Sequence, residues 1–380
     1  MLHHSSSNQA VAEKEAVEFF SERLESRIKK GASSCSEILR RIDEDGKSME
    51  DFLVPWGQDQ ADVRFRLIEG HPAIHHKSFG ARKLHPHATA QAAAKLGMPS
   101  SWIRDMSHSS EDWQKDRGIG DLDAFVQNTK PVNVLVRSIG DEVRGILSDR
   151  YRRLDSSTIL ASFLRKVDEE GGAPIRAALT PTRVYVEAAL PQVFPIETPK
   201  NGTEYVAAGV IYRTSDFGDG ADCVSGWLER LWCTNKVVAT HNLRQIHLGS
   251  KMAIESGFRP SRKTYVHDTM THASLVSDVV SSVLSSGEIK KHIDCVQKAS
   301  DEEVSFDRAA QYRLPKAGLT QSEIASVQSV LLDNSRELVP DGPLTLWKLS
   351  QAVSAVAQQH ALARRSDLEE LAGKLVFNNN

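Results

Sequence analysis

The sequence predicts an α+β protein with a largely antiparallel sheet, built on a hairpin–helix–hairpin core and followed by a helical C-terminal part. Two pairs of strand-like runs, at 132–147 and 175–189, each enclose a short turn, and a helical pattern separates the pairs. Strands joined by a tight turn pair antiparallel. Strands and helices grouped in this way favour the α+β class over alternating βαβ units.

The composition is that of a globular protein. The chain has 380 residues, of which 40% are hydrophobic and 26% charged. No run approaches 18 apolar residues and no apolar segment follows the first residues, so we expect neither a membrane span nor a secretory signal. The four cysteines are scattered without a CxxC pair, a pattern typical of the reducing cytoplasm. The formal net charge of −3 means that any contact with a polyanion must come from a local patch.

The first 97 residues contain three expected elements, two helices and a strand. Residues 9–30 predict an amphipathic helix, because apolar side chains recur at helical spacing. The polar segment 31–60 is expected to link this helix to the main body. An approximate alternation at 62–70 predicts a strand. The alanine-rich segment 86–97 predicts a helix with Pro86 in its first turn.

The clearest element is the hairpin at 132–147, whose two runs flank a Gly140-Asp141 turn. Asp155 then stands where it can cap a helix with one apolar face. A second hairpin at 175–189 follows that helix. This succession is the hairpin–helix–hairpin core.

The rest of the chain is predicted more coarsely. A loop rich in Pro and Gly is expected at 191–202, then a strand at 205–212, a glycine-containing turn and a helix-like stretch through Trp232. Segments 266–299 and 320–375 are mostly helical in pattern. We therefore divide the chain into an N-terminal helix and linker at 1–60, an α+β core at 61–265, and a helical C-terminal region packed on the core at 266–380.

Six segments resemble, in the same order, a family known as domain of unknown function 932, which is common in phages, plasmids and bacterial genomes. The LSDRYRRLD and RLWCTN stretches are the most specific. This sequence departs from the family pattern at Ser215-Asp216, where a Ser-Glu pair is usual, and at Lys236, where a glycine is usual. The resemblance implies an α+β fold and a mobile-element setting, and it supplies no catalytic residues. The matching segments are 90–106, 134–160, 175–191, 207–235, 241–249 and 344–359.

The distribution of charge points to a polyanion. Residues 230–265 contain seven Arg or Lys and a single acid, Glu255, with Trp232, Phe258 and Tyr265 among them. Cations that pair with phosphates and rings on which unstacked bases lie are what single-stranded nucleic acid requires. A second basic group stands at 150–153. The predicted nucleic-acid-binding residues are Arg150, Tyr151, Arg152, Arg153, Arg230, Trp232, Lys236, Arg244, Lys251, Arg259, Arg262, Lys263 and Tyr265.

Ordinary structural roles compete with these interpretations. The 150–153 group could be a solvated surface in which one arginine pairs with Asp149 or Asp155. The histidines between 71 and 87 are interpreted as solvated or helix-capping, because no partner pair has metal-ligand spacing. A loose set of Cys223, Cys233, His241 and His247 is too irregular to predict zinc. We predict no metal and no cofactor, and the sequence lacks GxSxG and HExxH motifs.

The leading hypothesis is a phage- or plasmid-type protein that binds DNA, preferentially single-stranded, or promotes its annealing in recombination or replication. A homo-oligomer is expected, because many copies on one strand multiply weak phosphate contacts. One alternative is a protein-interaction or structural factor that does not bind nucleic acid. A second is an enzyme whose site is assembled from distant residues such as Asp216, Asp219 and Cys233.

Overall fold

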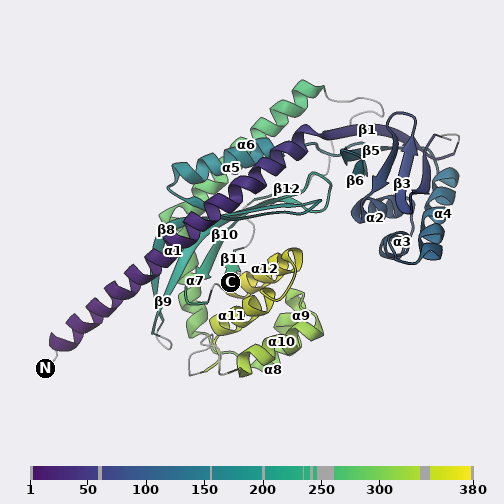
Figure 1. Ribbon diagram of the computed structural model, residues 1–380. Helices are drawn as coiled ribbons and strands as arrows, with labels where there is room; N and C mark the ends of the chain where they lie inside the picture. Colours follow the sequence, from purple (N-terminus) through teal and green to yellow (C-terminus); the bar gives the residue numbers. More distant parts are fainter. Residues whose placement is uncertain are drawn as a thin grey trace.

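The computed structural model describes residues 3–58, 62–154, 156–198, 202–233, 235–239, 243–245, 261–333 and 343–377. The α+β prediction is confirmed by two β-sheets and the helices that cover them. Figure 1 shows sheet A with its helices at one end of the molecule and sheet B at its centre. The long helix α1 runs along the sheet B half towards sheet A.

Sheet A has the strand order β1-β5-β6-β4-β3-β2, in which β4 runs parallel to β6 and the other neighbours are antiparallel. The predicted hairpin is confirmed as β5 and β6, with Gly140 at a φ of +58° in its turn. The strands of sheet A are β1 (Met49–Trp56), β2 (Arg64–Ile68), β3 (His71–His76), β4 (Gly80–Leu84), β5 (Val132–Ile139) and β6 (Glu142–Ser148).

Three helices cover sheet A: α2 (Pro86–Lys95), α3 (Ser100–Ser107) and α4 (Asp112–Asn128). The predicted helix at 86–97 is confirmed as α2, with Pro86 in its first turn. Apolar side chains of α2, α3 and α4 join those of the strands in one buried cluster. This half of the molecule therefore has a core of its own.

Helix α1 (His3–Lys47) is longer than predicted, and the expected linker at 31–60 does not exist as such. The first part of segment 31–60 continues α1. The next part forms β1, and every residue of β1 pairs with β5. The segment looks polar because only a narrow stripe, with Ile38, Leu39 and Ile42, packs on the core. Exposed ion pairs such as Arg40 with Glu37 occupy the rest of the helix surface.

Sheet B has the order β11-β10-β9-β8-β7, with β12 also paired to β10. Helix α5 (Ser156–Glu169) leads from β6 of sheet A to β7 of sheet B, so the two predicted hairpins belong to different sheets. The strands are β7 (Ala173–Leu179), β8 (Val184–Thr198), β9 (Gly202–Thr214), β10 (Asp222–Arg230), β11 (Lys236–Val238) and β12 (Leu243–Gln245).

Two predictions in this region are wrong. The expected loop at 191–202 lies largely within β8 and β9, where Pro195 pairs with Tyr205 beyond a bulge between Ala189 and Val193. The helix-like stretch through Trp232 contains β10 instead. All nine residues of β10 are buried, so the strand lacks the alternation by which a half-buried strand is recognised.

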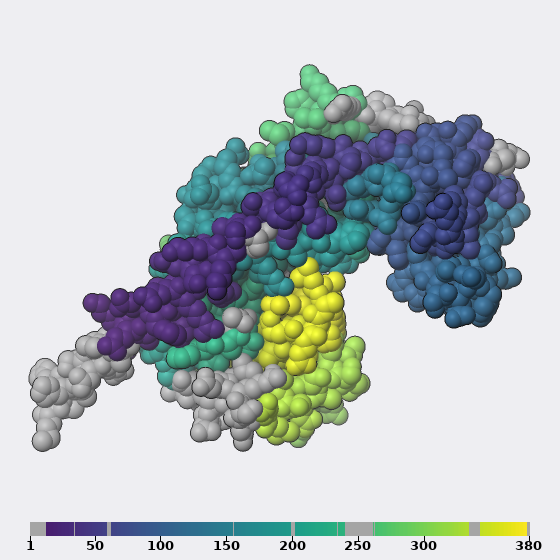
Figure 2. Space-filling view, in the orientation of Figure 1, coloured from purple at the N-terminus to yellow at the C-terminus, as the bar shows by residue number. Residues whose placement is uncertain are grey.

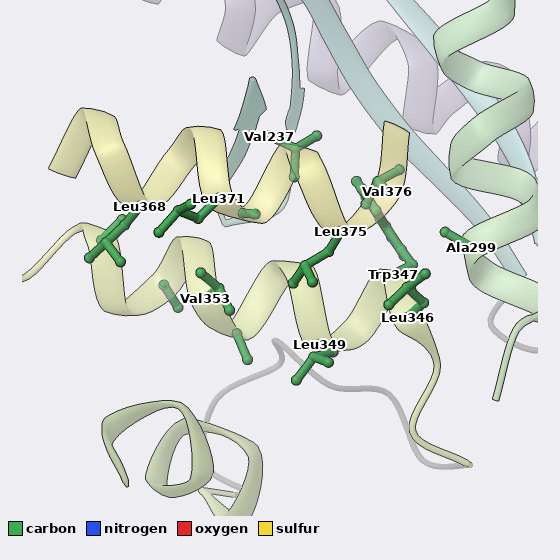
Figure 3. Close-up of a cluster of buried hydrophobic side chains, with 14 of the residues drawn as sticks. Val237, Ala299, Leu346, Trp347, Leu349, Val353, Leu368, Leu371, Leu375 and Val376 are labelled. Atoms are coloured by element: carbon green, nitrogen blue, oxygen red, sulfur yellow. The ribbon is translucent and has the colours of Figure 1, made fainter. Parts of the chain in front are cut away.

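The helical C-terminal region is confirmed for the described residues. Helices α5 and α6 (Arg262–Leu284) share one apolar cluster with sheet B. A second cluster joins sheet B to α7 (Ser286–Asp301), α10 (Gln321–Leu332), α11 (Leu346–Ala357) and α12 (Leu362–Phe377). Figure 3 shows its centre, where α11 and α12 lie side by side and Leu371 and Leu375 of α12 point towards α11. The short elements α8 (Phe306–Arg308), η1 (Ala309–Arg313) and α9 (Leu314–Ala317) complete the region.

Figure 2 shows α1 as a ridge across the sheet B half that reaches the lobe built on sheet A. In the described ranges, no helix has a stretch both long and apolar enough to cross a membrane.

Candidate nucleic-acid interface

The fold brings together two groups that are far apart in the sequence. The segment that follows β6 carries Arg152 and Arg153, and the first turn of α6 carries Tyr265. The guanidinium of Arg153 lies 5.3 Å from the centre of the Tyr265 ring. Arg152 donates through Nε and Nη2 to both carboxylate oxygens of Asp268, at 2.7 and 2.5 Å. Two parallel hydrogen bonds of this kind fix the start of α6 against the 150–153 group.

A cavity of about 590 Å³ opens at this junction, and we call it the α6 cleft. It is formed by the end of α1, β1, β5, the segments around 153–158 and 216, and the N-terminal half of α6. Its lining residues are Gly46, Met49, Asp51, Arg137, Arg153, Leu154, Ser156, Thr158, Asp216, Tyr265, Val266, Thr269 and Met270.

A buried arginine organises the polar part of the α6 cleft. Arg137, only 4% exposed, donates from Nε and Nη2 to the two carboxylate oxygens of Asp51, at 2.7 and 3.0 Å. Its Nη1 donates to the main-chain oxygen of Asp216 at 2.9 Å. Arg153 Nη1 lies 3.3 Å from Asp51 Oδ2. Asp51 therefore pairs with both Arg137 and Arg153, and Arg137 joins sheet A to the 215–219 turn.

The electrostatics keep Asp51 ionised. Burial alone would raise the pKa of the Asp51 carboxyl, but the hydrogen bonds and charge of Arg137, with the charge of Arg153, outweigh it and hold the pKa below its usual value. Arg137 is held charged in the same way. The pair supplies a fixed, preorganised set of donors and acceptors, not a titrating acid.

The turn between β9 and β10 is held rigidly at the edge of the α6 cleft. Ser215 Oγ accepts hydrogen bonds from the main-chain N–H groups of Phe217 and Asp219, at 3.2 and 2.9 Å. Ser156 Oγ, at the start of α5, donates to Asp216 Oδ2 at 2.5 Å. These contacts place the Asp216 side chain towards α5 and into the lining of the cleft.

Within the 150–153 group, the four residues have different environments. Tyr151 is buried, and its hydroxyl donates to the Ser215 main-chain oxygen at 3.1 Å, so it contributes to the framework and not to a contact surface. Arg150 is exposed, whereas Arg152 and Arg153 are half-buried in the ion pairs already described. Arg152 and Arg153 have carboxylate partners from other elements, Asp268 and Asp51. The alternative pairing with Asp155 lies outside the described residues.

Two of the predicted contact residues are buried. Arg230 donates from Nε to Glu204 at 2.6 Å, and both side chains are nearly inaccessible. Lys236 is 1% exposed, donates to Glu187, and has its Nζ 4.9 Å from the centre of the Trp227 ring. The expectation that these cations face solvent is therefore wrong: each neutralises a buried carboxylate inside sheet B.

Trp232 is half-exposed but belongs to another part of the surface. Its ring packs edge-on against Phe20 of α1, with centroids 4.6 Å apart. Gly46, near the other end of the same helix, lines the α6 cleft. At 1.5 Å of rise per residue, Phe20 and Gly46 are about 39 Å apart along α1. The predicted contact residues are thus divided between surfaces near the two ends of one helix.

The remaining predicted residues can be placed only in part. Lys263 is exposed in the first turn of α6. Arg262 begins α6 and Arg244 lies in β12, but their side chains are outside the described residues. Lys251 and Arg259 lie outside the described residues altogether.

Sequence reasoning missed Asp51 and Arg137, which organise the α6 cleft. A signal for Arg137 was present, because a lone arginine interrupts the apolar run of β5 and a buried charge requires a partner. No comparable signal identified Asp51, which stood in the segment interpreted as a linker.

One histidine of the segment between 71 and 87 has a defined structural role. His85 caps α2 by accepting the main-chain N–H of His87 at Nδ1, which confirms its helix-capping interpretation. Nowhere in the described ranges do three or more His, Cys, Asp or Glu side chains gather as metal ligands would. All four cysteines are free thiols.

No family model, no curated protein and no solved structure matches this chain. The resemblance to the family of domain of unknown function 932 therefore stays a prediction.

Proposed function

We propose that the protein binds nucleic acid, preferentially single-stranded DNA, as a phage- or plasmid-type accessory of recombination or replication in the cytoplasm. The observation that carries the proposal is the Arg153–Tyr265 pair at the α6 cleft. Two exposed cations adjoin it in the chain: Arg150, three residues before Arg153, and Lys263, two before Tyr265. Cations beside an accessible ring match the two exposed parts of a single strand, its phosphates and its unstacked bases.

Association of several copies along one strand is part of this proposal. A cleft with few cations makes few phosphate contacts, and each contact is weak at physiological salt. Copies bound side by side, or a ring of copies, would hold the strand through many such contacts at once.

An enzymatic role has one observation in its favour, the presence of Asp51 and Asp216 in one cleft. A general acid, however, needs a carboxyl whose pKa is raised, and the pKa of Asp51 is lowered by its arginines. Asp216 accepts the Ser156 hydroxyl. This arrangement suits recognition of a ligand better than proton transfer, so we favour binding.

The test is fluorescence anisotropy of a labelled 30-nucleotide single strand with the full chain, at salt concentrations from 50 to 200 mM. We expect binding at 50 mM salt. The logarithm of the association constant should then fall linearly with the logarithm of the salt concentration. Replacing both exposed cations (Arg150→Gln with Lys263→Gln) should reduce the slope by about 1.4, since each phosphate contact in a single strand contributes about 0.7.

The matched control is Lys290→Gln, which removes an exposed cation on α7 and should leave the salt slope unchanged. Absence of binding at 50 mM would refute the proposal and favour the protein-interaction alternative. If Lys290→Gln reduced the salt slope as much as the Arg150→Gln, Lys263→Gln double variant, the interface would not lie at the α6 cleft.

A further inference from the structure

We propose that the α6 cleft accepts one unstacked base of the bound strand, while the phosphates stay outside it. This inference rests on the proposed nucleic-acid binding and states what the cleft itself recognises. The cavity of about 590 Å³ lies within the range of roughly 300–1,000 Å³ typical of small-molecule pockets. It has room for a base and part of its sugar.

The first argument is the apolar wall. Val266 and Met270 stand one turn apart on α6 and are 53% and 55% exposed, although both are large apolar side chains. Met49 and Leu154 add apolar surface to the same cavity. No described residue buries this part of α6. The flat faces of a base are apolar, and covering such a wall with one would remove both surfaces from water.

The second argument is the stacking surface. Tyr265 lines the cavity, and the planar guanidinium of Arg153 lies over its ring. Unpaired bases stack on aromatic rings and on guanidinium planes alike. The Asp51 contact holds Arg153 in position, so the stacking surface is formed before any ligand arrives.

The third argument is charge, which decides between a base and a phosphate. Two arginines and two aspartates line the cavity: Arg137 and Arg153, Asp51 and Asp216. A phosphate would meet two carboxylates there, whereas no carboxylate of the described residues pairs with the exposed Arg150 or Lys263. A base is neutral and offers donors and acceptors together.

The carboxylates also predict which bases fit. A carboxylate accepts from the exocyclic amino group of cytosine, and adenine and guanine also carry such groups. Thymine lacks an exocyclic amino group, and its single N3–H donor stands between two carbonyl oxygens that would face Asp216 unfavourably. We therefore expect cytosine-containing strands to bind better than thymine-only strands of the same length.

The decisive experiment compares two ligands of equal charge, a labelled 20-nucleotide dC strand and an abasic deoxyribose-phosphate oligomer of the same length. We expect the dC strand to bind the full chain about tenfold more tightly, from base stacking. Tyr265→Leu should abolish this difference by weakening only the dC strand, and Tyr265→Phe should restore it. Tyr312→Leu removes an exposed tyrosine from η1 in the C-terminal region and serves as the matched control.

A second measurement addresses base choice. The dC strand should bind at least about fivefold more tightly than a dT strand. Asp216→Asn, which replaces one acceptor oxygen with a donor, should reduce this preference. Near-ultraviolet circular dichroism of each variant would establish that it is folded before its affinity is compared.

The outcomes separate the two proposals. If neither dC nor abasic oligomer binds at 50 mM salt, nucleic-acid binding itself fails. If both bind equally, or if Tyr265→Leu weakens both equally, the protein binds the strand through its backbone and the α6 cleft is not a base pocket. Equal affinity for dC and dT with a Tyr265-dependent preference over the abasic oligomer would overturn only the role of Asp216.

Discussion

At the scale of single residues, the function of a cation in this protein depends on its partner and not on its type. Lys236 and Lys263 belong to the same basic stretch of sequence, yet Lys236 is buried against Glu187 and Lys263 is exposed. Arg137 and Arg153 both interact with Asp51, and only Arg153 also presents a face to the Tyr265 ring. A count of charges along the chain therefore overstates the surface available to a polyanion.

The two lysines give a paired test of this distinction. Lys236→Met removes the buried charged partner of Glu187 and leaves the more exposed Arg176 3.8 Å away, so it should lower the free energy of unfolding by about 3 kcal/mol. Lys263→Gln should change it by no more than about 0.5 kcal/mol. Urea denaturation and DNA anisotropy on the same samples would check both. A larger loss of affinity in folded Lys236→Met than in Lys263→Gln would contradict the assignment.

Asp51 has a structural role that can be measured without any ligand. Asp51→Asn removes the charge that balances buried Arg137, so we expect a loss of about 3–5 kcal/mol in the free energy of unfolding. Asp105→Asn is the control, because Asp105 pairs with Arg104 on an exposed surface, where solvent screening leaves such pairs little effect on stability. Similar losses in the two variants would show that Arg137 does not depend on Asp51.

At the scale of elements, α1 connects both halves of the molecule and forms one end of the α6 cleft. It packs along the edge strand β7 and on α5, and then continues into β1 of sheet A. The close approach to β7 depends on Gly31. A Cβ built at Gly31 would lie 2.3 Å from the Ile175 main-chain oxygen, which is far inside van der Waals contact.

Gly31→Ala should therefore force α1 away from β7 and lower the free energy of unfolding by about 1–3 kcal/mol, as overpacking does. Gly46→Ala is the matched control in the same helix, because a Cβ there meets nothing nearer than 3.9 Å. Alanine has the higher helix propensity, so the control should be neutral or slightly stabilising. Thermal melting would measure both, and a stabilised Gly31→Ala would disprove the close approach.

At the scale of the whole molecule, ion pairs between distant elements join the helices to sheet B. Arg27 of α1 donates to Glu229 of β10, and Arg213 of β9 pairs with Glu370 of α12. Such pairs contribute to a single arrangement of the parts, because each buried charge requires its partner.

The pH dependence should have two windows. Burial lowers the pKa of His108 from 6.5 to about 4, so the unfolded chain binds a proton below pH 6.5 that the folded chain excludes. The contribution of His108 to the free energy of unfolding is fully present above pH 6.5 and is lost as the pH falls towards 4. Hydrogen bonds from Arg364 and Thr320 lower the pKa of Glu323 from 4.5 to about 2, so its contribution is complete above pH 4.5 and falls towards pH 2.

Urea denaturation at pH 7.5, 5.5, 4 and 3 would check both windows. His108→Asn should flatten the decrease between pH 6.5 and 4, and Glu323→Gln should flatten the decrease between pH 4.5 and 2. Each variant serves as the control for the other window. A decrease that neither variant alters would assign the acid sensitivity to other groups.

Local patterns in the sequence were sufficient for the α+β class, the β5–β6 hairpin, helix α2 and the helical C-terminal region. Their signals are periodicity and turn residues, which depend on neighbours a few positions away. Strand β10 was misinterpreted because it is covered on both faces, a property that arises only when helices far away in the chain pack on the sheet.

Of the candidate site, the sequence by itself determined only which side chains could bind a polynucleotide. Tertiary structure decided which of them face solvent, because it buries Arg230 and Lys236. It also decided which of them meet, because it places Arg153 over the ring of Tyr265 at the α6 cleft. It also added Asp51 and Arg137, whose pairing links β1 to β5. The physical reason is that exposure and charge pairing are set by contacts between distant segments, which no local pattern encodes.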